Sequence, residues 1–170
     1  PDMPSRVRSL FFRLKWNSVL NLNIGTETAA VRDKHWIYFA QKNIPFFRVG
    51  FAHNFSPSLA PRGKGSLYVE IAYSRRKPID KKAAIRRSVE KLRSLGLIAR
   101  REKIMCMDIN DISYGYPIYD RDHRRASGGI VDFLRKNRII SAGRYGSWKY
   151  FSMENALLDG KRAAEELTKA

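Results

Sequence analysis

The chain has 170 residues, 44% of them hydrophobic and 12% aromatic, so it is long and apolar enough to fold around a sizeable core. Its apolar runs are far shorter than the ~20 residues that a membrane-spanning helix needs, and no charged and then apolar leader opens it, so we expect a cytoplasmic protein without a membrane span. A single cysteine, Cys106, excludes an internal disulfide. Because Cys106 lies in an apolar run, we expect it to be buried and not a nucleophile.

The net charge is +17, from 33 Lys and Arg against 16 Asp and Glu. The basic residues fall in scattered pairs and not in one tract, which is typical of a generally basic surface. An anionic ligand or an acidic partner, including an acidic half of the same protein, remains an open alternative. Nucleic acid is not expected as a partner, because no recognition helix, zinc finger or aromatic RNA-binding signature accompanies the charge.

Four segments in the first half of the chain predict β-strands, because they are rich in β-branched and aromatic residues. They are residues 19–24, 36–39, 46–51 and 67–73. A loop rich in proline and glycine, residues 54–65, connects the last two strands. Such a long loop can carry function or can be a disordered tip, and both interpretations stay open.

The next segment predicts a helix that begins after the N-cap Asp80 and ends before Gly96, with apolar residues at helical spacing between them. Further predicted elements are a strand at 104–109, an extended aromatic stretch at 114–119 and a short helix at 129–136. The order of elements predicts an α+β fold, a largely antiparallel or mixed β-sheet with flanking helices that ends in a strand-turn-helix unit.

That last unit, residues 138–164, carries the pattern most typical of a binding site. Gly143 and Gly146 let the backbone approach a ligand closely, and Arg144 can pair with a phosphate. The helix after Ser152 presents unpaired N–H groups and the positive end of its dipole. An anion site is therefore predicted, and the alternative is an ordinary turn followed by a core helix. Arg162 is expected on the exposed side of that helix, without a role.

The run Gly143-Arg144-Tyr145-Gly146-Ser147-Trp148-Lys149-Tyr150, followed by Ser152-Met153-Glu154, resembles the C-terminal flavin-contacting motif of the flavin amine oxidase superfamily. That superfamily includes protoporphyrinogen oxidases, phytoene desaturases and UDP-galactopyranose mutases. The resemblance implies FAD as cofactor, with the turn near its pyrophosphate and the helix N-terminus at the flavin pyrimidine edge. The cofactor-binding residues that it implies are Gly143, Arg144, Tyr145, Gly146, Trp148, Tyr150, Ser152, Met153 and Glu154.

Stretches within residues 34–70 are more loosely similar to the substrate domain of the protoporphyrinogen oxidase-like and mutase-like branch. No G-x-G-x-x-G follows an early strand and the chain opens without an initiator methionine, so we expect the N-terminal FAD-binding domain to be missing. We expect residues 1–137 to form a substrate-binding domain and residues 138–170 to pack on the absent domain. The resemblance thus implies the substrate-binding part of a flavoprotein oxidoreductase, amine oxidase-like or protoporphyrinogen oxidase-like.

Two alternative functions stay open, namely a mutase-like flavoenzyme and a basic binding module without catalysis. The mutase motif resembles Gly-Arg-Leu-x-x-Tyr-Lys-Tyr-Tyr-Asp-Met, from which Trp148, Phe151 and Ser152 depart. In the mutases, tyrosines of this region hold the sugar-nucleotide diphosphate, and a phenylalanine cannot donate a hydrogen bond.

The substrate is expected to be a small molecule, and an anion is one open alternative for it. The side chains that could line its pocket, or could be ordinary sheet packing, are Tyr38, Phe47, Arg48, Tyr68, Tyr116 and Tyr119. We assign no metal site, because the three histidines lack ligand spacing, and no catalytic acid or base.

Overall fold

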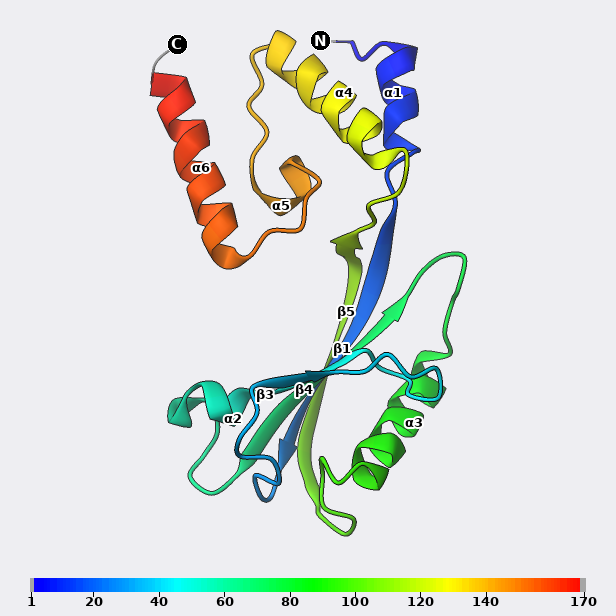
Figure 1. Ribbon diagram of the computed structural model, residues 1–170, viewed down its shortest axis with the longest axis vertical. Helices are drawn as coiled ribbons and strands as arrows, with labels where there is room; N and C mark the ends of the chain where they lie inside the picture. The colour runs from blue at the N-terminus through cyan, green and yellow to red at the C-terminus, as the bar shows by residue number, and fades with distance from the viewer. Residues whose placement is uncertain (1, 169–170) are drawn as a thin grey trace. The chain divides into compact units, whose positions relative to one another are not determined.

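The computed structural model describes residues 2–168. Its helices and strands are, in order, α1 (Ser5–Phe11), β1 (Trp16–Thr26), β2 (Trp36–Tyr38), β3 (Arg48–Phe51), α2 (Ala52–Phe55), the 3-10 helix η1 (Pro57–Leu59), β4 (Gly65–Tyr73), α3 (Lys81–Ser94), β5 (Ile104–Pro117), α4 (His123–Lys136), α5 (Gly143–Gly146) and α6 (Met153–Thr168) (Figure 1). The predicted α+β class is confirmed.

The five strands form one sheet in the order β2-β3-β4-β1-β5. β4 is antiparallel to both of its neighbours, and β2 is antiparallel to β3. This arrangement confirms the predicted largely antiparallel sheet, in which β2 and β5 are the edges.

One face of the sheet forms the core. Leu20, Leu22 and Ile24 of β1 lie opposite Ile71, Val69 and Leu67 of β4, and all six are buried. Ala84 and Leu92 of α3 belong to the same cluster, so α3 covers this face. Because side chains alternate along a strand, the other face carries Asn21 and Asn23 of β1 opposite Glu70 and Tyr68 of β4.

The ends of α3 follow from local sequence, as predicted. Asp80 is its N-cap, and the side chain of Asp80 accepts a hydrogen bond of 3.1 Å from the N–H of Ala83. Gly96 lies two residues beyond the last helical residue, with a φ of 72° that favours glycine.

The chain divides into two compact units. The terminal unit consists of Pro1–Asn17 and Tyr116–Ala170, and the sheet unit of Ser18–Gly115. In the terminal unit, α1 packs closely on α4, because a Cβ on Gly129 would lie only 2.7 Å from Cδ1 of Leu10. The predicted boundary between residues 137 and 138 lies inside the terminal unit, and the packing of residues 138–170 on a further domain stays a prediction.

Several local predictions need correction. β5 is one continuous strand and not a strand followed by a separate aromatic stretch, and α4 begins at His123 instead of at residue 129. The chain ends in a turn and a helix, but the strand expected before the Gly143 turn is absent, because residues 139–142 have no strand assignment. Cys106 is exposed on the edge strand β5, so its predicted burial is wrong. Among the described residues, no helix is long and apolar enough to cross a membrane.

Candidate functional site

The predicted cofactor turn consists of the short helix α5 and the residues that lead from it to α6. Gly143 opens the turn with a φ of 80°, a conformation that side chains disfavour. No described atom lies within 4 Å of the place where a Cβ on Gly143 would stand. The turn therefore requires a glycine for its backbone conformation and leaves its Cα side open.

Asp159 of α6 fixes this turn. Its Oδ2 accepts hydrogen bonds from the Gly143 N–H at 2.8 Å and from the Ser147 hydroxyl at 3.2 Å. Its Oδ1 accepts from Nη2 of Arg162 at 2.6 Å, and only 10% of the Asp159 side chain is exposed. Burial alone would raise the pKa of Asp159, but these hydrogen bonds and the Arg162 charge together hold it below its ordinary value. Arg162 is exposed, as expected, and the expectation that its loss changes little stays a prediction.

Arg144 lies beside two tyrosine rings that stack on each other. Its Cζ is 5.4 Å from the ring centre of Tyr116 and 5.1 Å from that of Tyr150, and the two rings stack on each other at 5.7 Å. Nε and Nη2 of Arg144 both donate hydrogen bonds to the carbonyl oxygen of Phe151. The guanidinium therefore holds the segment that leads into α6 in place. These contacts of the guanidinium are with a carbonyl oxygen and aromatic rings, which do not neutralise its positive charge.

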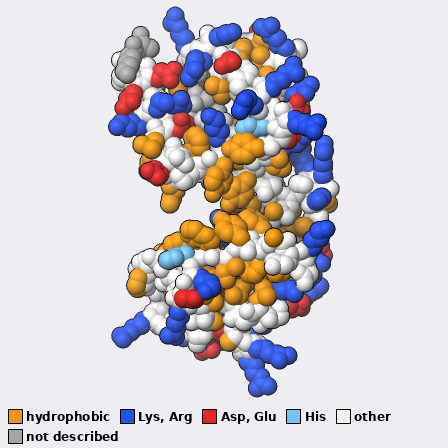
Figure 2. Space-filling view, viewed as in Figure 1, with side chains coloured by type: hydrophobic (Ala, Val, Ile, Leu, Met, Phe, Trp, Pro, Cys, Tyr) orange, Lys and Arg blue, Asp and Glu red, His pale blue; other side chains and the backbone are white. Residues whose placement is uncertain are grey.

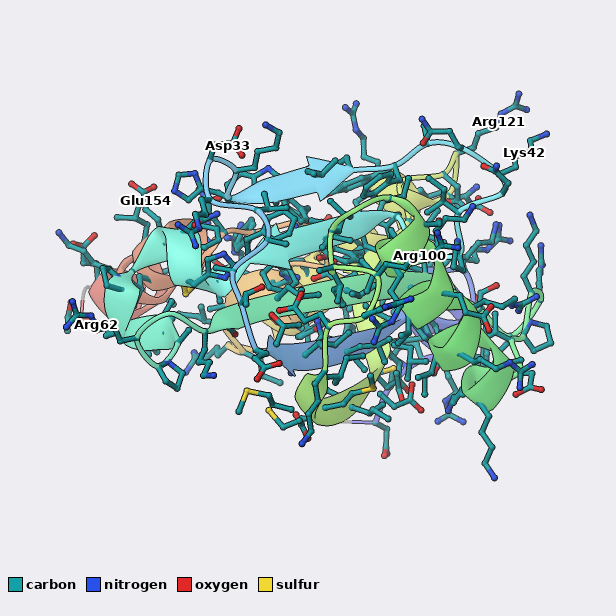
Figure 3. The ribbon with its side chains drawn as sticks, turned by 90° about the horizontal axis from the view of Figure 1, so that it is seen from below. Asp33, Lys42, Arg62, Arg100, Arg121 and Glu154 are labelled. Atoms are coloured by element: carbon teal, nitrogen blue, oxygen red, sulfur yellow. The ribbon has the colours of Figure 1, made fainter. Side chains whose placement is uncertain are left out.

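The first turn of α6 is capped by a reciprocal pair. The Ser152 hydroxyl accepts from the Asn155 N–H at 3.1 Å, and Oδ1 of Asn155 accepts from the Ser152 N–H at 3.2 Å. Within residues 2–168, the N–H groups of Met153 and Glu154 have no acceptor. Glu154 extends outward from α6 (Figure 3). The helix N-terminus thus keeps free donors and the positive end of its dipole.

Other aromatic residues of the terminal unit contact the residues between α5 and α6. The Tyr119 hydroxyl accepts a hydrogen bond of 2.6 Å from the Tyr150 N–H, and Nε2 of His123 donates to the Trp148 carbonyl oxygen at 2.7 Å. The Trp148 ring packs edge-on against Trp16 at 6.1 Å, and its buried Nε1 has no acceptor among the described residues. Trp148 therefore packs within the terminal unit, and its predicted contact with the cofactor stays a prediction.

Three of the predicted substrate residues meet on the sheet face opposite α3. Cζ of Arg48 is 5.7 Å from the ring centre of Tyr38 and 5.8 Å from that of Tyr68. Nη1 of Arg48 donates to the Tyr38 hydroxyl at 3.1 Å, and Nη2 pairs with Glu70 at 2.5 Å. Burial raises the pKa of Tyr68, and the Arg48 charge opposes that rise only in part. Phe47 lies just before β3, and its N–H donates to the Glu70 carbonyl oxygen.

The six predicted substrate residues thus fall into two sets. Tyr38, Phe47, Arg48 and Tyr68 belong to the sheet unit, whereas Tyr116 and Tyr119 lie beside the turn in the terminal unit. Sequence reasoning missed Asp159 and His123, whose partners are distant along the chain. The signal that could have found Asp159 is the Asp-x-x-Arg pair on α6, which is common on exposed helices and therefore weak.

Comparisons with known proteins extend these observations. No protein-family model matches the chain. A crystal structure of reduced UDP-galactopyranose mutase is similar with a TM-score of 0.89 and 21% identity, over 95% of this chain and 36% of that one. A proposed protoporphyrinogen oxidase from Exiguobacterium sp. 255-15 is similar with a TM-score of 0.68 and 11% identity, over 92% of this chain and 35% of that one. The chain therefore has the fold of about a third of each of these two proteins.

Proposed function

We propose that this chain is the substrate-binding part of an FAD-dependent oxidoreductase, amine oxidase-like or protoporphyrinogen oxidase-like, and that its turn forms one wall of the flavin site. The turn carries this proposal. Gly143 has a left-handed conformation with open space at its Cα, and an arginine lies beside it. The N-terminus of α6 keeps free N–H donors. Together these features suit a bound phosphate and an electron-rich ring edge. The similarity in fold to the mutase and to the proposed oxidase supports it.

The residues present fit FAD in a particular way. The N–H of Gly143 is already bonded to Asp159, so Gly143 would serve close van der Waals approach and not hydrogen bonding. Arg144 and the N–H groups of Met153 and Glu154 would then supply the attraction for negative charge. The flavin, when bound, accepts or returns a hydride or electrons. The chain's own residues bind and orient the cofactor and the substrate.

We propose further that residues 138–170 pack on an FAD-binding domain through one side of α6. Met153, Leu157 and Leu167 lie on that side with 88%, 76% and 63% of their surface exposed. Gly160 and Ala164 lie between them at the spacing of one helical stripe. An exposed apolar stripe of this kind indicates a protein contact.

We propose that the aromatic residues already described in each of the two units are separate candidates for contacting a small-molecule substrate. In the sheet unit, Tyr38 and Tyr68 flank Arg48, and in the terminal unit Tyr116 stacks beside Arg144. Flat aromatic faces with a few fixed polar groups are typical of small-molecule sites.

A mutase-like flavoenzyme is the second candidate, favoured by the similarity to UDP-galactopyranose mutase over 95% of this chain. The replacement of a tyrosine by Phe151 speaks against it, because a hydroxyl is lost. The missing hydroxyl does not affect the position of Arg144, because Arg144 binds the backbone carbonyl oxygen of Phe151 and not the Phe151 side chain. The lost hydroxyl therefore matters only for direct contacts between the ring at position 151 and a ligand.

Titration with FAD, followed by flavin fluorescence, tests the proposal. The chain alone should bind FAD weakly or not at all, because it offers only one wall of the site. The parent protein, expressed from the full coding region around this chain, should purify with FAD bound. Stoichiometric micromolar binding by this chain alone, or a parent protein without flavin, would overturn the proposal.

A comparison of two activities of the parent protein decides between the oxidoreductase and the mutase. An oxidoreductase should show flavin reduction by candidate amines or porphyrinogens, whereas a mutase should interconvert UDP-galactopyranose and its isomer.

A further inference from the structure

Basic residues concentrate around α3. Residues 75–103 contain 12 of the 33 Lys and Arg of the chain and only three acids. Two of those acids have structural partners, since Asp80 caps α3 and Glu102 accepts hydrogen bonds from the loop at Thr28. Figure 2 shows that Lys and Arg side chains also outnumber acidic ones on the visible face. The α3 region is therefore strongly positive.

Some of these cations have fixed partners within the fold. Arg93 donates to the carbonyl oxygens of Ala99, Arg100 and Glu102, and Lys81 pairs with Asp111. Within the described part of the chain, Arg87 and Lys91 of α3 have no such partner, and the same holds for Lys42 in the loop before β3. Among residues 2–168, no ion pair involves any of these three cations.

These three cations border one groove. A groove of about 640 Å³ lies between α3 and the loop before β3, and Lys42, Arg87 and Lys91 line it together with the single acid Glu90. Its apolar lining includes Pro45, Ile79 and Ala84, and no aromatic residue lines it. Lys42 extends from its loop away from the sheet (Figure 3). The groove thus combines cations with an apolar floor.

We propose that this groove and the exposed cations of α3 dock the sheet unit on an anionic phospholipid bilayer. The cations match the lipid phosphates, and the apolar floor matches the glycerol and upper acyl region of a lipid. Leu95, exposed at the end of α3, adds an apolar side chain next to the groove residue Ser94. Single-stranded nucleic acid fits the groove less well, because bases bind by stacking on aromatic residues and none is present there. This interaction lies beyond the proposed flavin chemistry and does not depend on it.

Co-sedimentation of the full chain with vesicles tests the docking surface. The chain should bind vesicles of phosphatidylcholine with phosphatidylglycerol, should not bind vesicles of phosphatidylcholine alone, and should dissociate as salt rises. The double variant R87E/K91E should bind at least about thirtyfold more weakly, because each cation near an anionic surface contributes about 1 kcal/mol. The matched control R124E/R125E changes the net charge equally on exposed α4 and should lose less than about threefold.

The other outcomes overturn the proposal. Equal losses in the two double variants would mean that net charge alone drives binding. Binding of single-stranded DNA that is tighter than vesicle binding, and is lost in R87E/K91E, would mean a nucleic-acid surface. Dodecyl phosphate should displace the chain from vesicles far better than inorganic phosphate, and equal displacement would remove any role for the apolar floor. If circular dichroism shows that R87E/K91E is unfolded, the single variants Arg87→Gln and Lys91→Gln replace it in the vesicle assay. Each should weaken vesicle binding about fivefold. No loss of binding in either single variant would refute the site.

Discussion

Replacing Asp159 with alanine should loosen the Gly143 turn and destabilise the terminal unit. The substitution removes the acceptor of the Gly143 N–H at 2.8 Å and of the Ser147 hydroxyl at 3.2 Å, and it leaves Arg162 without its partner. A hydrogen bond to a charged group contributes about 1.5–3 kcal/mol, but the Ser147 hydroxyl can turn to water and Arg162 is largely exposed. The expected loss is therefore about 2–4 kcal/mol, dominated by the Gly143 bond.

The thermal midpoint measures this loss. For a chain of this size, about 2–4 °C per kcal/mol gives a decrease of about 4–16 °C. Trp16 and Trp148 belong to the terminal unit and Trp36 to the sheet unit, so a Trp36→Phe background makes tryptophan fluorescence report the terminal unit alone. Glu165→Ala is the control, because Glu165 is an exposed acid on the same helix whose contact with Lys161 is 3.9 Å long. If the Asp159 variant melts at the same temperature as the control, the carboxylate does not hold the turn.

The same residue predicts a dependence on pH. Because the folded pKa of Asp159 is lowered, its stabilising effect is complete above the pKa of an unfolded aspartate, about 4, and is lost as pH falls through the folded value. Asp159→Asn carries no titrating group at this position, so the wild type should exceed it in stability at neutral pH. Urea unfolding should show that this difference shrinks below about pH 4. A constant difference down to pH 3 would contradict the lowered pKa.

Three further predictions concern single positions. Gly143→Ala should lower the stability of the chain by about 1 kcal/mol, because residue 143 has a φ of 80°. Gly160→Ala, within α6 and with open space around it, should raise that stability by up to about 1 kcal/mol. Thermal midpoints of the two variants that move in the same direction would refute this. Arg144→Ala in the parent protein should lower FAD affinity about tenfold or more and also lower the midpoint, and an unchanged FAD content would exclude the cofactor contact. Glu102→Gln should cost about 1–3 kcal/mol in urea unfolding, because the buried carboxylate binds the loop at Thr28, while exposed Glu90→Gln should change little.

Sequence could predict those elements whose signals are local. β1 and β4 alternate apolar and polar residues because α3 covers only one of their faces, and α3 itself has a capping aspartate and a terminal glycine. The turn from Gly143 to Glu154 could be recognised because its residues are contiguous. Their grouping in the fold confirms nothing about FAD, which stays a proposal.

The remaining features depend on contacts between distant residues. β5 is an edge strand that is exposed along most of its length, so it lacks the alternation that would have joined its two halves. The sequence predicted a helix from residue 129, yet Gly129 lies inside α4, and Cδ1 of Leu10 of α1 lies 2.7 Å from the place where a Cβ on Gly129 would stand. Asp159 lies 16 residues from Gly143, and only the fold brings the two together.

The two arginines of the candidate sites differ in the charge that they can offer to a ligand. Arg48 pairs with Glu70, with 18% and 11% of the two side chains exposed, so the platform between Tyr38 and Tyr68 is close to neutral. Arg144 donates to a carbonyl oxygen and stacks on tyrosines, and within residues 2–168 it has no carboxylate partner.

An anionic group should therefore be attracted to Arg144 and not to Arg48. A single guanidinium that already binds the Phe151 carbonyl oxygen cannot serve a flavin pyrophosphate and a substrate phosphate equally well. If Arg144 serves the cofactor, its loss lowers the flavin content of the parent protein. If Arg144 serves a sugar-nucleotide diphosphate, its loss leaves the flavin bound and raises the KM for that substrate, so flavin content and KM of the Arg144→Ala parent protein together separate the oxidoreductase from the mutase.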